Sequence, residues 1–255
     1  METVKFELTS QMAIIRKPDS NETYYTYNFP HKIMILGMIG AIIGLNGYNY
    51  YSFQKSLGKK VSGIPEFYEK LKELKIGIKP IISEKNYSRK IQTFNNSVGY
   101  ASEEVGNNLI VKEQVLEKPS WYIYILESEL DEYKKIREYL LNKKCEYIPY
   151  IGKNDYFADI KNVSIETISD QIETTTINSL FEEKIANLKN NLIEELLGFD
   201  NKPSKLYLYQ ELLPVELSEK IGYSKFSKFI YTNQELEILD NKNIYKVAGE
   251  NIYYF

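Results

Sequence analysis

A nearly unbroken apolar run with three glycines inside it constrains this chain more than any other segment. Residues 33–45 read IMILGMIGAIIGL and carry no charge. A glycine inside a helix costs about 1 kcal/mol relative to alanine, and the spacing of Gly37, Gly40 and Gly44 places all three on one helical face. The run is shorter than the roughly 20 residues that a bilayer requires. It therefore predicts a buried helix whose bare face lets another surface, which we expect to be a sheet, approach closely.

The composition is that of a globular protein and excludes several kinds of covalent, metal and catalytic site. Of the 255 residues, 43% are hydrophobic and 26% are charged, which suits a folded core. The single cysteine, Cys145, excludes an intrachain disulfide and a cysteine zinc cage, and the single histidine, His31, excludes a catalytic histidine pair. The chain opens on alternating residues rather than on a charged leader with an apolar stretch, so we expect a cytoplasmic protein without a membrane partner.

The net charge of −3 is divided unevenly along the chain. Residues 1–118 hold 16 Lys and Arg against 12 Asp and Glu, a balance of +4, whereas residues 119–255 hold 16 against 23, a balance of −7. A polyanion should therefore meet the first half. The 23 tyrosines could supply surfaces on which bases stack, although the accompanying abundance of Ile, Lys and Asn favours a compositional bias.

The order of the predicted elements indicates an α+β fold. In chain order the patterns predict a strand over 3–9, the glycine-faced helix, an amphipathic helix over 64–76, a hairpin over about 81–118, a strand over 121–126, a helix near Asp131 capped from Ser128, and a closing strand within 145–160. This is the split βαβ order of a ferredoxin-like fold.

The rest of the chain predicts a smaller C-terminal unit. Ser179 and Glu182 form a capping-box pattern ahead of apolar residues at helical spacing, which predicts a helix that ends at Gly198. Three further segments read as strands: 206–209, 243–249 and 251–255. We therefore expect a ferredoxin-like domain over 1–161 and a small α/β extension over 162–255 that packs on it.

No motif indicates nucleotide hydrolysis or metal-dependent catalysis. Two Gly-Lys pairs, at 58–59 and 152–153, lack both the upstream glycine and the following Ser or Thr of a phosphate-binding loop. Carboxylate pairs such as 103–104 stand apart from any second acidic cluster, so a solvated surface explains them more simply than a magnesium site. We predict no cofactor, no metal site and no catalytic residue.

Basic residues in the first half are better candidates for a binding site. They follow the first predicted strand, begin the glycine-faced helix or lie in the hairpin: Arg16, Lys17, Lys32, Arg89, Lys90 and Lys112. In the predicted fold these three places could converge into a groove that neutralises phosphates. His31, which follows Pro30 at the helix start, could contact an anion there beside free backbone amides, although a partly exposed surface histidine is the alternative.

Three motifs in this order resemble the CRISPR-associated Cas-five family. Residues 29–44, FPHKIMILGMIGAIIG, resemble the Phe-Pro pair and Gly-x-x-Gly-x-x-x-Gly helix near the start of that family. Residues 110–126 resemble its thumb hairpin running into a central strand, and residues 147–160, YIPYIGKNDYFADI, are similar to its Tyr-x-Pro-Tyr-(Leu/Ile)-Gly-(Lys/Arg) segment. The closing residues, 245–255, resemble its terminal strands, and the tyrosine-rich form looks most like the type I-B branch.

The resemblance implies a fold, a function and a set of contacts. Such a protein has a ferredoxin-like, RNA-recognition-type palm with a β-hairpin thumb and works in the prokaryotic cytoplasm. It binds the 5′ handle of crRNA, contacts the backbone subunit and the large subunit of a type I Cascade complex, and meets target DNA only through that complex. The positions implied to face the handle are Lys32, Lys112, Gly152 and Lys153, with Asn154 next to them in the same turn.

One branch of the family, type I-C, offers the alternative function of a metal-independent endoribonuclease. Its members process precursor crRNA with a set that resembles Tyr, Lys and His. Here Lys112 is followed by Glu113 and Gln114, where such an enzyme would have a histidine near its lysine. Because a missing acid or base group forfeits about 10²- to 10⁴-fold in rate, we predict binding without cleavage.

Overall fold

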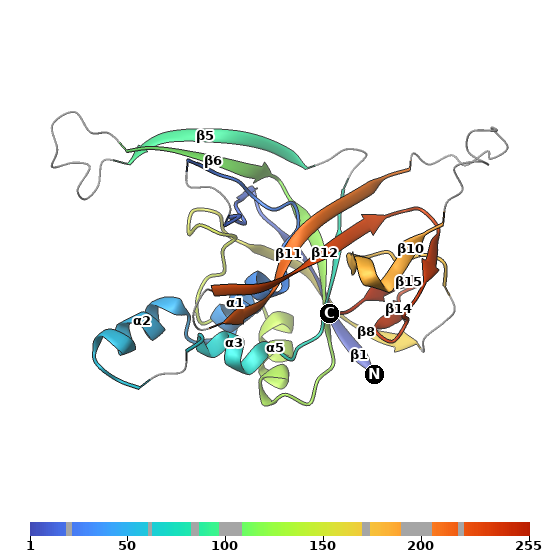
Figure 1. Ribbon diagram of the computed structural model, residues 1–255. Coiled ribbons are helices and arrows are strands. Elements are labelled where there is room, and N and C mark those ends of the chain that lie inside the picture. Colours follow the sequence, from blue (N-terminus) through green and yellow to red (C-terminus); the bar gives the residue numbers. More distant parts are fainter. Residues whose placement is uncertain are drawn as a thin grey trace.

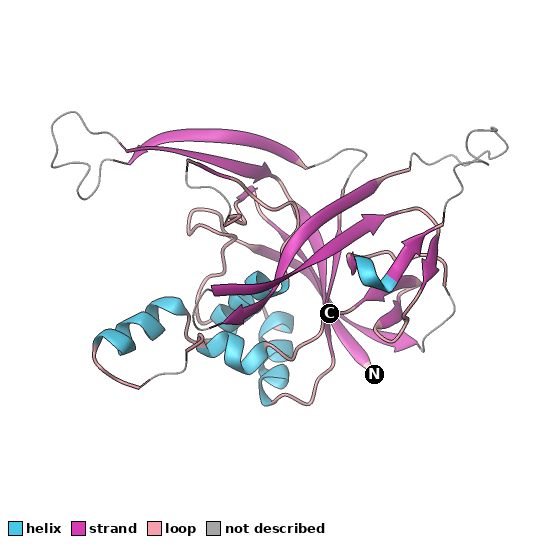
Figure 2. Cartoon of the chain, in the orientation of Figure 1, coloured by secondary structure: helices cyan, strands magenta, loops and turns pink. Residues whose placement is uncertain are grey.

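The computed structural model describes residues 1–18, 22–60, 63–82, 87–96, 109–169, 174–189, 206–218 and 222–255. Within these ranges the chain is an α+β protein with more strands than helices (Figure 2). Its main layer is an antiparallel sheet in the order β15-β14-β8-β1-β7-β4. The six strands are β1 (Glu2–Thr9), β4 (Ile76–Pro80), β7 (Ser120–Leu126), β8 (Asp159–Ser169), β14 (Ile244–Val247) and β15 (Glu250–Tyr253).

Alternating apolar residues build the centre of this sheet. Val4, Phe6 and Leu8 of β1 are fully buried, and Phe6 lies opposite Ile123 of β7. Successive side chains of a strand point to opposite faces, so these residues share one face and enter the main core. The strands predicted over 3–9 and 121–126 are confirmed.

Three helices join the same core: α1 (Lys32–Ile43), α3 (Glu66–Leu71) and α5 (Asp131–Leu141). They gather beneath the sheet in Figure 1, while α2 (Tyr48–Ser56) extends away from them. The glycine-faced helix, the helix over 64–76 and the helix near Asp131 are confirmed in place, although α3 is shorter than expected because the chain enters β4 at Ile76.

The predicted hairpin forms a long ribbon that projects from the body (Figure 1). β5 (Ser88–Asn96) pairs antiparallel with β6 (Leu109–Glu117). The base of β6 is widened by the short strands β2 (Met12–Ala13) and β3 (Thr23–Tyr24). The tip expected between the two strands lies outside the described residues.

The predicted closing strand begins later than expected. Residues 145–158 form a loop that is held by a bridge between Tyr150 and Phe157, and β8 starts only at Asp159. The loop forms because Gly152 has a left-handed backbone, with φ of +86°, which interrupts an extended strand. The division predicted at residue 161 consequently falls inside β8.

The predicted helix after Ser179 is wrong in its described part. Residues 181–188 form β9 (Phe181–Glu182), the 3₁₀ turn η1 (Glu183–Ile185) and β10 (Ala186–Leu188). The Ser179 hydroxyl accepts a hydrogen bond from the Tyr253 amide at 2.9 Å rather than capping a helix. Tertiary contacts with the C-terminal strands therefore override the local helical pattern, and residues 190–198 lie outside the described residues.

The predicted C-terminal strands are present, together with longer strands that the patterns missed. β11 (Leu208–Ser218) pairs along its length with β12 (Gly222–Thr232), which also pairs with β9, and β13 (Leu236–Ile238) pairs with β10. In Figure 1 this hairpin crosses in front of α1, and Leu213 and Phe229 belong to the main core.

The end of the chain closes the main sheet. The amides of Ile76 and Phe255 each donate to the other residue's carbonyl at 3.1 Å, which joins the end of β15 to the edge of β4. A Cβ at Gly77 would lie 2.6 Å from Ile252, so the missing side chain makes room for the terminal strand. Residues 244–255 are thus part of the main sheet rather than an outer attachment.

Among the described residues, no single helix has the length and apolarity to cross a bilayer. Only α1 and α2 taken together satisfy length and composition, and they are bent by 77° relative to each other.

Candidate functional site

A cleft of about 790 Å³ opens beside α1. Its walls come from residues 14–16, one face of α1, the start of α2, Phe67 of α3, the loop over 147–152 and Tyr223 on β12. Segments from six parts of the chain therefore meet around one concave surface, which is the usual form of a ligand site.

The glycine face of α1 forms part of this wall and lies against α3. A Cβ built on Gly40 would be 2.5 Å from the Cβ of Phe67, and one on Gly37 would be 3.6 Å from the Phe67 ring. The helix therefore approaches α3 closely, which corrects the expectation that the glycine face lies on the sheet. Gly44 has a different part: it ends α1 in the left-handed conformation with φ of +83°.

The opposite wall is the Pro-Tyr-Ile-Gly-Lys turn. A Cβ on Gly152 would overlap the carbonyl oxygen of Ile14 and lie 2.8 Å from its carbonyl carbon. The Ile14 amide donates to the Ile151 carbonyl at 3.3 Å, and the Ile151 amide donates to the Tyr156 carbonyl at 2.8 Å. Only glycine permits this backbone contact, and the contact sets Tyr150 at the edge of the cleft.

Tyrosines dominate the rim of the cleft. Tyr48, Tyr50, Tyr147 and Tyr150 all line it and expose between 50% and 61% of their surface. Exposed aromatic rings around a groove are suited to stacking with unpaired bases, at about 1–3 kcal/mol per base. The sequence patterns missed these residues; the one available signal was the high tyrosine content.

Arg16 is the one charged side chain among the described residues that line the cleft. Its guanidinium carbon lies 3.6 Å above the ring centre of Tyr24, and the backbone is fixed by a bridge to Thr26. Stacking of this kind orients a guanidinium while its donors stay available. Since none of these lining residues is Asp or Glu, the cleft favours an anion or a neutral base over a cation.

His31 lines the cleft but is uncharged at pH 7. Its Nδ1 accepts a hydrogen bond from the Met34 amide at 3.2 Å and so caps α1, while Nε2 lies 3.4 Å from the Tyr223 hydroxyl. Burial lowers its pKa to about 3, so the ring is neutral at pH 7. His31 is therefore the N-cap of α1; the alternative of a partly exposed surface histidine is wrong, because only 2% of its surface is exposed, and the anion contact stays a prediction.

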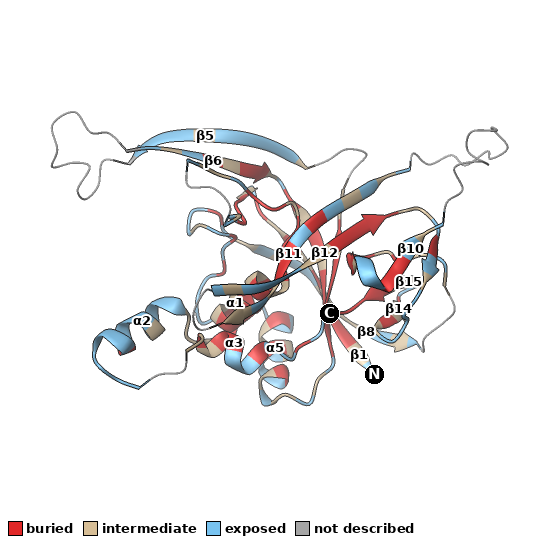
Figure 3. Ribbon diagram, in the orientation of Figure 1, coloured by how far each residue is buried: buried red, intermediate tan, exposed pale blue. Residues whose placement is uncertain are grey.

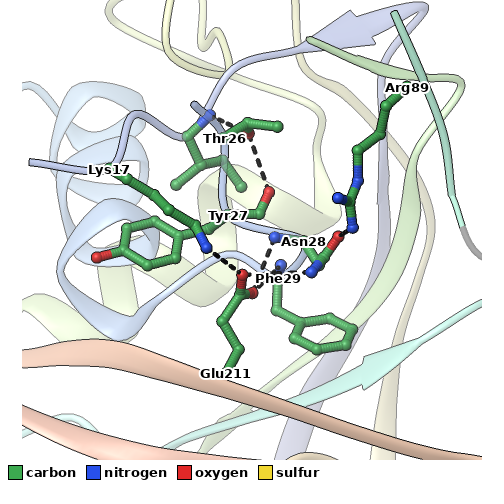
Figure 4. Close-up of polar contacts among 8 residues, drawn as sticks. Lys17, Thr26, Tyr27, Asn28, Phe29, Arg89 and Glu211 are labelled. Carbon is green, nitrogen blue, oxygen red and sulfur yellow. Dashed lines mark hydrogen bonds and ion pairs between the residues drawn. The ribbon is translucent and has the colours of Figure 1, made fainter. Parts of the chain in front are cut away.

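Lys17 belongs to a buried network on the other side of the loop that precedes α1 (Figure 4). Its Nζ lies 3.1 Å from a carboxylate oxygen of Glu211 on β11. The same carboxylate accepts from the amides of Asn28 and Phe29 at 2.8 and 3.3 Å, and the Arg89 guanidinium donates to the Asn28 side chain. Lys17 and Arg89 are thus brought together, but around an acid that the sequence did not single out.

Burial raises the pKa of the Glu211 carboxyl, and Lys17 together with the two backbone amides acts in the opposite direction. A buried carboxylate that has these donors is a fixed structural group. The network therefore anchors the Phe-Pro segment to β11 and pairs Lys17 with a buried acid.

Lys153 is likewise paired with a buried acid. Its Nζ lies 2.5 Å from Glu113 of β6, whose side chain is 4% exposed, and 4.6 Å from the ring centre of Phe94. In the same region the Tyr156 hydroxyl donates to Gln92 at 2.7 Å. These contacts attach the Gly152 turn to the middle of the β5–β6 ribbon.

The remaining predicted residues lie at separate places. Lys32 is half-buried outside the lining of the cleft, and burial lowers its pKa to about 8 beside Glu73, Lys75 and Glu182. Lys90 and Lys112 lie on the ribbon, and Lys90 pairs with Glu117 at 3.4 Å. The exposed Asn154 follows the Gly152 turn. The single basic groove that the sequence predicted is not formed by these side chains.

The described residues contain no group of three or more His, Cys, Asp or Glu side chains able to hold a metal ion.

Comparison with known proteins gives remote structural similarity. No protein-family model and no curated protein matches the sequence significantly. The structure is similar to a chain of a CRISPR RNA-guided surveillance complex, with a TM-score of 0.49 and 11% identity over 92% of this chain and 91% of that one. It is also similar to a CRISPR protein from Archaeoglobus fulgidus, with a TM-score of 0.47 and 13% identity over 99% and 98% of the two chains.

A third similar structure is a chain of the type III-B Cmr-beta complex bound to cognate target RNA and AMPPnP, with a TM-score of 0.40 and 11% identity over 92% of this chain and 86% of that one. Similarity at this level assigns neither an activity nor partners to the chain described here.

Proposed function

We propose that this chain is a non-catalytic subunit of a type I CRISPR surveillance complex and that its cleft binds the unpaired 5′ handle of crRNA. In this proposal it joins the backbone subunit to the large subunit and meets target DNA only through the assembly. The subtype that fits the motifs best is I-B. Recognition of unpaired RNA commonly combines stacking of splayed bases with contacts to phosphates, and the cleft offers both.

The observation that carries the proposal is a convergence in space. The Phe-Pro helix motif and the Tyr-x-Pro-Tyr-Ile-Gly-Lys motif stand more than 100 residues apart in the sequence. Both line the same cleft, through Met34 and Gly37 on one side and Tyr150 and Gly152 on the other. Their meeting at one concave surface supports a common role for that surface.

The sheet topology supports the expected palm. The strand order β8-β1-β7-β4, with α1 after β1 and α5 between β7 and β8, is the split βαβ arrangement of a ferredoxin-like fold. The projecting β5–β6 ribbon supports the proposal of a β-hairpin thumb. Its basic residues then belong to the contact with RNA or with the neighbouring subunit.

The alternative function, a metal-independent endoribonuclease, needs an acid or base group at the reacting atoms. His31 is a poor candidate because both of its ring nitrogens face protein partners and burial holds its pKa at about 3. General acid catalysis works best when the pKa lies near the working pH. The buried, neutral state of His31 supports binding without cleavage.

The proposal is tested by fluorescence anisotropy with labelled repeat RNA from the CRISPR array of the same genome. We expect Tyr150→Ala to weaken binding roughly 5- to 100-fold, which corresponds to the loss of one stacked base. The matched control is Tyr122→Ala, which removes a tyrosine from the opposite face of the main sheet and should leave the affinity unchanged.

Three outcomes would overturn the proposal. Equal affinity of the Tyr150→Ala and wild-type proteins would exclude the cleft, and loss of binding in the Tyr122→Ala protein alone would place RNA on the sheet. Specific cleavage of the repeat RNA in the presence of chelator, abolished by Tyr150→Ala or Arg16→Met, would instead favour the endoribonuclease.

A further inference from the structure

Helix α2 extends away from the body of the protein (Figure 1), and its first residues line the cleft. Nearly all of its surface is open in Figure 3, and Gln54 is its one buried residue. An isolated helix of fewer than about 12 residues is marginal in water. A nine-residue helix with so little burial therefore stands to gain from a partner.

The exposed surface of α2 is aromatic and apolar along one side. Tyr50, Phe53 and Leu57 stand at helical spacing, in the helix and at its C-cap, and expose 50%, 58% and 56% of their surface. Residues three and seven positions apart lie on the same helical face. Rings presented in this way offer stacking surfaces to bases, as the rim of the cleft does.

The charge around these rings has one sign. Lys55, Lys59 and Lys60 are exposed, and the sequence has no Asp or Glu between Glu22 and Glu66. No ion pair to a described residue involves the three lysines, in contrast to Lys17 and Lys153. A group of exposed cations that pair with no described acid, interleaved with aromatic rings, is complementary to a single-stranded nucleic acid.

The helix is continuous with the cleft. Tyr48, Asn49 and Tyr50 form the first turn of α2 and also line the cleft. The Tyr48 ring meets the Phe67 ring edge to face at 5.8 Å, so the beginning of α2 is fixed to the floor of the site. A strand that leaves the cleft on this side meets α2 next.

We propose that α2 is a second RNA contact, along which the strand continues after it leaves the cleft. Phosphates face Lys55, Lys59 and Lys60, and bases stack on Tyr50 and Phe53. This inference rests on the proposed function because it extends the path of the same RNA. It assigns a ligand to residues 50–60, which none of the three family-like motifs includes.

The test compares a short RNA, just long enough to fill the cleft, with a series of longer RNAs that share the same 5′ end. The variant is the triple substitution Lys55→Glu, Lys59→Glu and Lys60→Glu. We expect it to bind the short RNA as the wild type does. For the long RNAs we expect the slope of log affinity against log salt to fall by roughly 2, because each phosphate contact to a single strand contributes about 0.7.

A charge-matched control separates a local contact from a general effect of charge. Lys134→Glu, Lys161→Glu and Lys246→Glu change the charge by the same amount on α5, β8 and β14, away from α2, and should leave the slope unchanged. A further variant, Phe53→Ala, should weaken binding of long RNAs roughly fivefold or more and leave the short RNA unaffected.

The outcomes distinguish this inference from the proposed function. Failure of the wild-type protein to bind either RNA would reject the proposed function itself. Wild-type binding of both RNAs with no difference in the α2 variant would reject only the inference. An α2 variant that binds all RNAs normally but no longer copurifies with a protein subunit would assign α2 to that subunit and also reject the inference.

Discussion

Arg16 and Lys17 are neighbours in the sequence but belong to two regions with opposite electrostatics. Arg16 lines the cleft, where none of the described lining residues is an acid. Lys17 faces Glu211, a buried carboxylate that also binds the backbone before α1. The comparison teaches that the position of a buried acid, rather than the position of a base, decides whether that base supports the fold or faces a ligand.

The largest expected effect tests whether the Gly152 turn really fixes the wall of the cleft. Gly152→Ala places a Cβ on the Ile14 backbone in addition to forcing alanine into a left-handed conformation. We expect the free energy of unfolding to fall by roughly 3–4 kcal/mol, from the strain and the overlap together. Chemical denaturation measures it.

Gly249→Ala is the matched control for this substitution. Gly249 has φ of +87°, against +86° for Gly152, but a Cβ there meets nothing within 4 Å. Gly249→Ala should lower the free energy of unfolding only by the backbone strain, about 1–2 kcal/mol. Equal losses in the two variants would show that the contact with Ile14 does not hold the turn.

The second prediction tests the structural role assigned to the Glu211 region. Glu211→Ala leaves the amides of Asn28 and Phe29 and the Lys17 ammonium without their acceptor. Removing the acceptor of buried donors costs about 1–3 kcal/mol, so we expect a stability loss near the upper end of that range, measured by urea denaturation. An unchanged stability would mean that the network does not anchor the Phe-Pro segment.

The third prediction concerns His31, which joins the two regions at the start of α1. Its folded pKa of about 3 lies below the unfolded value near 6.5, so below pH 6.5 the unfolded chain takes up a proton that the folded chain does not. Stability is therefore lost as pH falls. Between pH 7 and pH 5 we expect this group to remove about 2 kcal/mol from the free energy of unfolding.

His31→Asn isolates the contribution of the histidine. Asparagine is a good N-cap but does not titrate. The effect of the carboxylates therefore cancels when the free energies of unfolding of wild type and variant are subtracted at each pH. Parallel pH profiles for the two proteins would contradict the view that His31 is buried as a neutral ring.

The smallest expected effect on stability comes from substituting Arg16, which we compare directly with Lys17. Arg16→Met should change stability by no more than about 0.5 kcal/mol, as for an exposed residue, while it weakens RNA binding roughly tenfold through one lost charge-assisted contact. Lys17→Met should lower stability, because it leaves the buried Glu211 without its cation, and should change RNA affinity less. The reverse pattern, measured by anisotropy and denaturation, would break the comparison.

The sequence predicts those parts of the fold whose pattern agrees with their tertiary surroundings. The alternation of β1 and the apolar spacing of α5 correspond to the faces that are buried, and the unbroken apolar run of α1 corresponds to a helix that is buried around most of its circumference. The pattern after Ser179 is equally helical, yet this hydroxyl bonds to the Tyr253 amide, which lies 74 residues away. A contact between distant segments leaves no local signal, so the strands at 181–188 could not be predicted.

The same limit applies to the candidate site. The motifs and the charge pattern predicted Gly152 and Arg16 as binding residues, and both line the cleft. They also predicted Lys17 and Lys153, which instead pair with buried acids. Nothing in the local sequence shows that Glu211 would lie beneath Lys17. The tyrosines of the rim were missed because a tyrosine in a tyrosine-rich chain carries little information until its exposure is known.

The most direct test of the central claim is photocrosslinking of repeat RNA that carries 4-thiouridine within the handle, followed by mass spectrometry of the linked peptides. We expect the crosslinks to fall in the peptides that contain Tyr48, Tyr147 and Tyr150, and to disappear when unlabelled handle RNA competes. Crosslinks confined to the sheet face around Tyr122, with none in the peptides that line the cleft, would contradict the account.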